Sequence, residues 1–341
     1  MAVLASRSAP PLPAALAQVS EWSLGSTAEF SPLSAQRYLL FEAGSAETLN
    51  QEETERIVAW LGQLPCPTIA IAHDGVDDAV TAACDVVLDD PGHAAPLLAN
   101  IEHCPIAASV LVQLLRTTAS LPMLDALTVE SLAYATLQGG AEFQRWLAQN
   151  KAASPAQPTD DGPPVVVTRD DDELRLELNR PSNRNAINLE MRDALVEALQ
   201  LVIADSSIRS VKASGRGKCF SVGGDLTEFG TLPNPAMAHV IRGLTMPGRF
   251  LAQCAERVEF HVHGACIGSG VELPAFGRCV TAAADSFFHL PELRFGLIPG
   301  GGGCVGIPRR IGRQRTAWLV LSGKRINAKQ ALEWGLVDAI V

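Results

Sequence analysis

The stretch that decides the fold is Gly264-Ala265-Cys266-Ile267-Gly268-Ser269-Gly270-Val271-Glu272, in which a predicted strand passes through a glycine-rich bend into a predicted helix. Glycine lets the backbone approach a ligand closely, and the first N–H groups of a helix have no partner within that helix. Such a bend favours negative charge. It is no dinucleotide fingerprint, because the third glycine and a downstream ribose-binding acid are not in place. A bend of this kind is by itself usually only a tight turn.

Two further stretches could act together with this bend. Residues 219–225 (CFSVGGD) form a predicted turn of small residues, and residues 291–303 (PELRFGLIPGGGG) combine an acid with a run of glycines. If Val222 supplies a second N–H, the two loops form an oxyanion hole for a carbonyl that becomes an enolate. Glu272 and Glu292 then stand where a general acid and a general base are needed. Each feature also has a plain structural reading, since a Glu in the first turn of a helix complements the helix dipole.

The order of the motifs resembles that of the enoyl-CoA hydratase/isomerase (crotonase) superfamily from about Pro164 to Val341. This resemblance implies an α/β fold with a crotonase-like core, a superhelix of ββα units. The matching elements are Arg180-Pro181, Asn185-Ala186, residues 220–226, 263–265, 268–273, Pro291-Glu292, residues 296–300 and residues 335–337.

The resemblance also implies roles for individual residues. The N–H groups of Val222 and Ser269 would surround the thioester oxygen of an acyl-CoA substrate. Glu272 would activate the water that adds to the β-carbon, and Glu292 would exchange the proton at the α-carbon. Many relatives keep only one of these acids, so the presence of both favours hydration of a 2-enoyl-CoA to a 3-hydroxyacyl-CoA, a lyase reaction of fatty acid metabolism. The alternatives are an isomerase, other acyl-CoA enolate chemistry, or a catalytically silent assembly subunit.

Several positions bear on substrate binding and on departures from the family pattern. Ser269 replaces a glycine, which is unfavourable if the backbone there needs a positive φ. Arg278 stands where the family usually has an aspartate, and Glu259 and His261 interrupt a strand that is usually apolar. Arg184 is similar to positions that meet coenzyme A phosphates, although a solvated surface arginine is an equal alternative. The residues expected to bind substrate are Arg184, Ala186, Gly223, Gly224, Asp225 and Gly268.

Composition excludes several classes of protein. The chain has 341 residues, of which 47% are hydrophobic, so overall disorder is excluded. No apolar run reaches about 18 residues, so no membrane association is expected. The 8 cysteines contain no Cys-x-x-Cys pair, and we therefore expect no metal site and a reduced, cytoplasmic protein. Coenzyme A enters only as part of the substrate, and no other cofactor is expected.

Charge is distributed unevenly along the chain. Residues 1–163 carry 6 Lys/Arg against 19 Asp/Glu (net −13), whereas residues 164–341 carry 21 against 18 (net +3). This asymmetry is consistent with an anionic ligand in the second part, and equally with an acidic, solubilising surface on the first. No dense basic run with interleaved aromatics is present, which disfavours nucleic acid as a partner.

Local patterns divide the chain into four segments. Residues 1–36 are predicted to be a poorly ordered tail, 37–150 a degenerate partial crotonase-like or helical domain, 151–164 a linker, and 165–341 the catalytic core. Helices are predicted over 51–63 and 189–204. Residues 95–150 resemble the helices that end a typical family member, so we expect this α-rich part to dock on the core in their place. The alternative is an unrelated helical domain. A homo-oligomer, trimer or hexamer, is expected from the resemblance.

Overall fold

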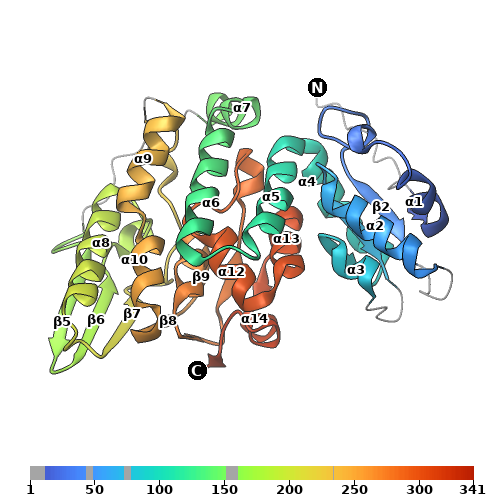
Figure 1. Ribbon diagram of the computed structural model, residues 1–341. Coiled ribbons are helices and arrows are strands. Elements are labelled where there is room, and N and C mark those ends of the chain that lie inside the picture. Colours follow the sequence, from blue (N-terminus) through green and yellow to red (C-terminus); the bar gives the residue numbers. More distant parts are fainter. Residues whose placement is uncertain (1–11, 44–48, 73–77, 151–159, 233) are drawn as a thin grey trace. The chain divides into compact units, whose positions relative to one another are not determined.

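The computed structural model describes residues 12–43, 49–72, 78–150, 160–232 and 234–341 (Figure 1). The chain forms two compact units, Met1–Pro105 and Ile106–Val341. The sequence predicts a boundary at residues 151–164, whereas the helices of residues 106–150 belong to the second unit. Most of the predicted linker, residues 151–159, lies outside the described residues.

The first unit contains a four-stranded parallel sheet, and three of its strands lie within the short strands that the sequence pattern predicts over residues 37–43, 68–72 and 83–88. Its two central strands are almost continuously apolar and buried, as is typical of parallel strands. Within this sheet, the Asp85 carboxylate accepts hydrogen bonds from the N–H and the hydroxyl of Thr68. The elements are β1 (Ala14–Ala15), α1 (Leu16–Trp22), β2 (Leu39–Glu42), α2 (Gln51–Gln63), β3 (Thr68–Ile71), α3 (Ala79–Ala83), β4 (Val86–Leu88) and α4 (Ala94–His103).

The predicted poorly ordered tail is ordered over its described part. Residues 1–11 lie outside the described residues, but strand β1 and helix α1 follow directly. Leu16, Val19 and Phe30 are buried in the hydrophobic core of this unit. The ring of Phe30 also packs edge-on against Trp60 of α2, with centroids 5.5 Å apart. The composition, rich in Ala, Ser and Pro, suggests that the conformational entropy lost on folding outweighs the gain from packing. Burial of these side chains offsets that entropy.

The second unit is built on a six-stranded sheet in the order β13-β10-β8-β7-β6-β5 and a three-stranded sheet in the order β12-β11-β9. Strands β5 and β6 pair antiparallel, and the other neighbours in the larger sheet pair parallel. The strands are β5 (Val165–Asp170), β6 (Glu173–Leu178), β7 (Ser210–Gly215), β8 (Val258–Val262), β9 (Ala265–Ile267), β10 (Cys279–Ala282), β11 (Phe287–His289), β12 (Ile326–Asn327) and β13 (Ala339–Ile340).

The charged residues of β8 have a simple explanation in this sheet. Val258, Phe260 and Val262 are buried, while the residues between them face the other side of the strand. Glu259 pairs there with Arg278, so two of the departures from the family pattern compensate each other away from the core.

Helices cover the sheets of the second unit, and three of them precede the core in the sequence (Figure 1). Helix α6 packs against α9, α10 and α12. At the start of this segment, the Glu142 carboxylate accepts the N–H groups of Ile106 and Ala107 at 2.9 Å. The helices are α5 (Pro105–Thr118), α6 (Met123–Gln138), α7 (Ala141–Gln149), α8 (Leu189–Ala204), α9 (Pro235–Thr245), α10 (Pro247–Cys254), α11 (Ser269–Glu272), α12 (Gly303–Ile311), α13 (Arg313–Ser322) and α14 (Ala328–Trp334).

No single helix among the described residues has the length and apolar character needed to cross a membrane. One pair of successive helices, residues 91–103 and 105–118, meets that test only when the two are taken together across a sharp bend.

The packing of α5–α7 predicts different outcomes for two truncations. A fragment of residues 105–341 keeps α6 against α9, α10 and α12, and we expect it to unfold cooperatively in urea. A fragment of residues 160–341 exposes the apolar surface under α6, and we expect it to aggregate. Size-exclusion chromatography and circular dichroism distinguish the two. A monodisperse, cooperatively folding shorter fragment would show that the three helices are dispensable.

Candidate active site

A cavity of about 630 Å³ lies in the second unit. It is bounded by α6, α9, the loops that follow β7 and β9, and the residues around the glycine run. Gly223 does not line it, in contrast to the sequence-based expectation. The other predicted residues that line it are Arg184, Ala186, Val222, Gly224, Asp225, Gly268, Ser269, Glu272 and Glu292.

The bend after β9 has a geometry that explains its unusual serine. Gly268 carries the positive φ, at 52°, while Ser269 is the first residue of α11. The serine therefore does not need the backbone conformation that would strain it. Gly268 donates its N–H to the carbonyl of His289, at 2.9 Å. Within the described part of the chain the Ser269 N–H has no hydrogen-bond partner, so a ligand in the cavity could use it.

Gly223 acts on the site by close approach. Its φ is 85°, and a Cβ atom at this position would lie 2.5 Å from the carbonyl oxygen of Ile267 and 3.2 Å from the nitrogen of Ser269. Only a glycine lets the loop of residues 222–225 lie against the bend. Asp225 has a local role as well, because its carboxylate accepts hydrogen bonds from the N–H and the hydroxyl of Thr227.

Val222, the second predicted oxyanion donor, is engaged in this structure. Its N–H donates to the carbonyl of Arg184 at 3.2 Å. The backbone around that carbonyl has a left-handed conformation, which is uncommon for residues other than glycine, because Arg184 and Asn185 have φ values of 53° and 52°. The buried Asn185 side chain donates to the carbonyls of residues 216, 219 and 220 and fixes the turn. A ligand oxygen that uses the Val222 N–H must compete with Arg184.

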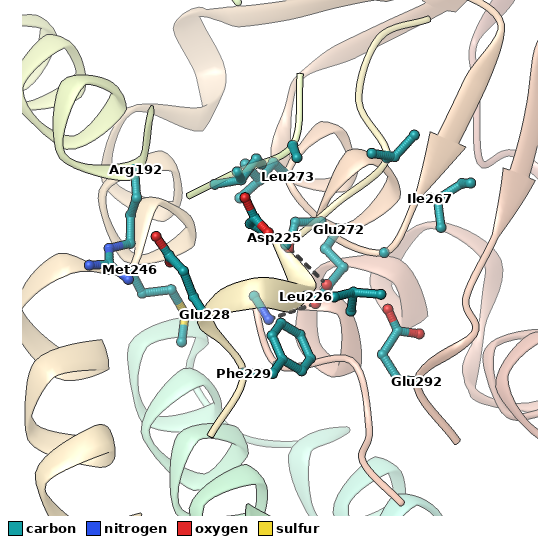
Figure 2. A pocket seen from close by; sticks show the side chains of 18 of the residues that line it. Arg192, Asp225, Leu226, Glu228, Phe229, Met246, Ile267, Glu272, Leu273 and Glu292 are labelled. Atoms are coloured by element: carbon teal, nitrogen blue, oxygen red, sulfur yellow. Dashed lines mark hydrogen bonds between the residues drawn. The ribbon is translucent and has the colours of Figure 1, made fainter. Parts of the chain in front are cut away.

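Glu272 is buried and anchored by the backbone of the glycine run. Its Oε2 accepts the N–H groups of Gly301 at 2.7 Å and Gly303 at 2.9 Å. Its Oε1 accepts the Ser269 hydroxyl at 3.3 Å. Burial raises the pKa of this carboxyl, and the hydrogen bonds from the two backbone N–H groups and the Ser269 hydroxyl oppose that rise. Figure 2 shows Glu272 and Glu292 among the residues that line the cavity.

Glu292 is also buried, and the one backbone hydrogen bond that opposes the effect of its burial comes from its own N–H rather than from the glycine run. Its Oε2 has no hydrogen-bond partner among the described residues. Burial, together with the charge of Glu272, raises its pKa well above the ordinary value. Two carboxyl groups in one cavity thus have different environments. The pKa of both carboxyl groups is raised, but only Glu272 accepts hydrogen bonds from the glycine run, and such a contrast suits two carboxyl groups to different proton-transfer roles.

Glu130 is a functional candidate that sequence reasoning missed. It is fully buried on α6, and its two oxygens accept the N–H groups of Gly302 and Cys304, both at 2.8 Å. Four successive N–H groups, from residue 301 to residue 304, therefore alternate between Glu272 and Glu130. The signal in the sequence was weak, because an acid within a helical pattern is usually solvated. No group of three or more metal-ligating side chains occurs among the residues that the structure describes.

Comparisons with known proteins agree on one family for the second unit. Residues 174–341 match the family described as enoyl-CoA hydratase/isomerase. The chain is similar to 1,2-epoxyphenylacetyl-CoA isomerase of Escherichia coli (strain K12), with 36% identity over 49% of this chain and 66% of that protein. It is also similar to 2,3-dehydroadipyl-CoA hydratase of the same strain, with 32% identity over 52% of this chain and 68% of that protein.

A solved structure of enoyl-CoA hydratase from Thermoplasma volcanium GSS1 is 32% identical and covers 53% of this chain and 72% of that one, with a TM-score of 0.47. The chain spans 60–68% of the length of the first curated relatives it matches.

Because Glu130 accepts two of the four N–H groups of residues 301–304, we predict that it stabilises the fold. Glu130→Leu leaves two buried N–H groups without an acceptor, which costs about 1–3 kcal/mol for each. Glu130→Gln keeps one carbonyl oxygen, and we expect it to lose roughly half as much. The free energy of unfolding in urea measures the effect, with Glu197→Gln on the exposed side of α8 as the control. Equal stability of the Leu variant and the wild type would show that the N–H groups find other acceptors.

Proposed function

Since this chain belongs to the enoyl-CoA hydratase/isomerase family, we propose that it adds water across the double bond of a 2-enoyl-CoA thioester to give a 3-hydroxyacyl-CoA. The observation that carries this proposal is the pair of buried carboxyl groups, Glu272 and Glu292, in one cavity with contrasting hydrogen bonding.

The contrast supports a division of labour between the two acids. Glu272, whose carboxylate is stabilised by two backbone N–H groups, takes a proton from water while the water oxygen bonds to the β-carbon. The electrons of the double bond move toward the thioester, which forms an enolate. Glu292, in its protonated form, delivers a proton to the α-carbon. One water is consumed, and the proton gained by Glu272 balances the one lost by Glu292, so the step requires no redox cofactor.

The enolate oxygen needs hydrogen-bond donors where its charge develops. The Ser269 N–H is the better supported donor, because it has no partner within the described residues. The Val222 N–H remains a second proposed donor, and its use requires the Arg184 carbonyl to yield. Arg184, an exposed residue at the edge of the cavity, is the proposed contact for coenzyme A phosphates. The predicted trimer or hexamer stays a prediction.

Isomerisation of the double bond is the second candidate, because the chain matches a dienoyl-CoA isomerase of Mus musculus (33% identity) as well as hydratases. An isomerase moves one proton between two carbons and consumes no water, so it needs one principal acid–base group. The two reactions therefore differ in how they respond to removal of each carboxyl group.

We expect the wild-type protein to hydrate crotonyl-CoA or a longer or aryl 2-enoyl-CoA. The reaction is monitored by the loss of absorbance of the conjugated double bond, and the product is then identified. Glu272→Ala and Glu292→Ala should each lower kcat by at least about 100-fold, the usual lower contribution of one general acid or base. A large loss with only one variant, and a product that contains no added water, would favour the isomerase. Absence of turnover on every thioester would favour a silent subunit.

The proposed oxyanion donor is tested by a pair of substitutions at one position. Ser269 is the first residue of α11, a position that tolerates proline, and Ser269→Pro removes both the N–H and the hydroxyl. We expect Ser269→Pro to lower kcat by about 100–1,000-fold, as removal of one such donor typically does. Ser269→Ala keeps the N–H and loses the hydroxyl bond to Glu272, so its rate should change by less than about tenfold. Equal rates in the two variants would exclude the Ser269 amide.

A further inference from the structure

Arg242 on α9 lines the cavity and forms no ion pair with any residue that the structure describes. Its Nε donates to the Ser131 hydroxyl at 3.1 Å, one terminal nitrogen donates to Gln138 Oε1 at 3.0 Å, and the other donates to the Ser131 carbonyl at 3.2 Å. All three acceptors are neutral groups on α6. No carboxylate among the described residues lies within ion-pair distance of this guanidinium. The charge of Glu130 acts on the pKa of Arg242 from a greater distance. Both carboxylate oxygens of Glu130 accept hydrogen bonds from backbone N–H groups.

The guanidinium keeps unused hydrogen-bonding capacity. Arginine has five N–H donors, and the three bonds above leave one N–H on each terminal nitrogen without a partner in the described part of the chain. Two such N–H groups match the two oxygens of a carboxylate, and hydrogen bonds between charged groups are the strong ones. A half-buried cation that borders a cavity and lacks a counter-ion is costly unless a ligand supplies one.

The position of Arg242 relates it to the proposed reaction. Its guanidinium carbon lies 4.6 Å from the centroid of the Tyr134 ring. The same ring packs so closely on Gly300 that no Cβ atom would fit there, and the next residue, Gly301, donates its N–H to Glu272. The tyrosine ring thus links the arginine to the loop that holds the carboxylates.

The cavity between these groups suits an acyl chain. Its walls include the apolar side chains of Phe229, Ile241 and Met246. Methylene groups would lie against these side chains, and a charged end group would reach the arginine.

We propose, resting on the function proposed above, that this site takes enoyl-CoA thioesters whose acyl chain ends in a carboxylate, and that Arg242 binds that carboxylate. The competing explanation is that Arg242 only ties α9 to α6. Arg249 on α10 offers a matched control for that explanation, because it donates to the Thr128 hydroxyl on α6 at 3.1 Å and does not line the cavity.

The experiment compares kcat/KM for six-carbon 2-enoyl-CoA with and without a terminal carboxylate, and for the methyl ester of the carboxylated form. We expect the wild-type protein to prefer the carboxylate over both neutral substrates by at least about tenfold. Arg242→Gln should abolish this preference, because kcat/KM for the carboxylated substrate should fall at least about tenfold more than kcat/KM for the neutral substrates, chiefly through KM. Arg242→Lys, which keeps the charge but not the paired N–H groups, should retain part of the preference. Arg249→Gln should leave the preference intact.

The outcomes separate this inference from the proposed function. Turnover of the neutral substrate with no preference for the carboxylate would overturn the role of Arg242 and leave the hydratase proposal standing. An equal loss on all substrates in Arg242→Gln would show that the residue is only structural. If no thioester is turned over, calorimetric binding of saturated adipyl-CoA against hexanoyl-CoA decides. Tighter binding of adipyl-CoA that depends on Arg242 supports the inference, and equal binding overturns it.

Discussion

Four successive backbone N–H groups at the start of α12 impose the constraint on which the rest of the site depends. The first N–H groups of a helix have no acceptor within it, and buried ones must find acceptors elsewhere. Here Glu272 takes those of Gly301 and Gly303, and Glu130 takes those of Gly302 and Cys304. The glycine run is thereby folded between two carboxylates. The side chain proposed to activate water is also the one that holds the loop, so its position is well defined.

This arrangement also sets the electrostatics of the cavity. Glu130, Glu272 and Glu292 are all buried, and the charge of Glu272 raises the pKa of both other carboxyl groups. N–H groups of the glycine run oppose the rise in pKa at Glu130 and Glu272. Glu292 receives none of them, and its Oε2 has no hydrogen-bond partner among the described residues. The contrast between Glu272 and Glu292 thus follows from their hydrogen bonding, because both are buried and line the same cavity.

One part of the cavity wall comes from a part of the chain that precedes the family match. That match covers residues 174–341, whereas Tyr134 and Gln138, which line the cavity, belong to α6. Glu130 on the same helix accepts hydrogen bonds from the glycine run, at Gly302 and Cys304. Packing requires only that a helix reach the right surface, and a helix that precedes the matched residues in the chain meets that requirement here.

Local patterns determined a large part of this protein. The α/β class with a crotonase-like core is confirmed, helices α2 and α8 have the predicted bounds, and Glu272 and Glu292 lie in one cavity as the motif order implies. Periodicity, glycines and motif spacing are properties of neighbouring residues, so a sequence displays them directly.

Tertiary structure alone decided the rest. Several features depend on partners that are far away in the chain. They are the boundary between the two units at residue 105, the ordered structure of residues 12–36, the acceptor of the Val222 N–H, and the contacts of Glu130 and Arg242. The sequence pattern of a helix that carries a carboxylate is the same whether water or a backbone N–H donates a hydrogen bond to that carboxylate. Only the packed fold determines which partner is present.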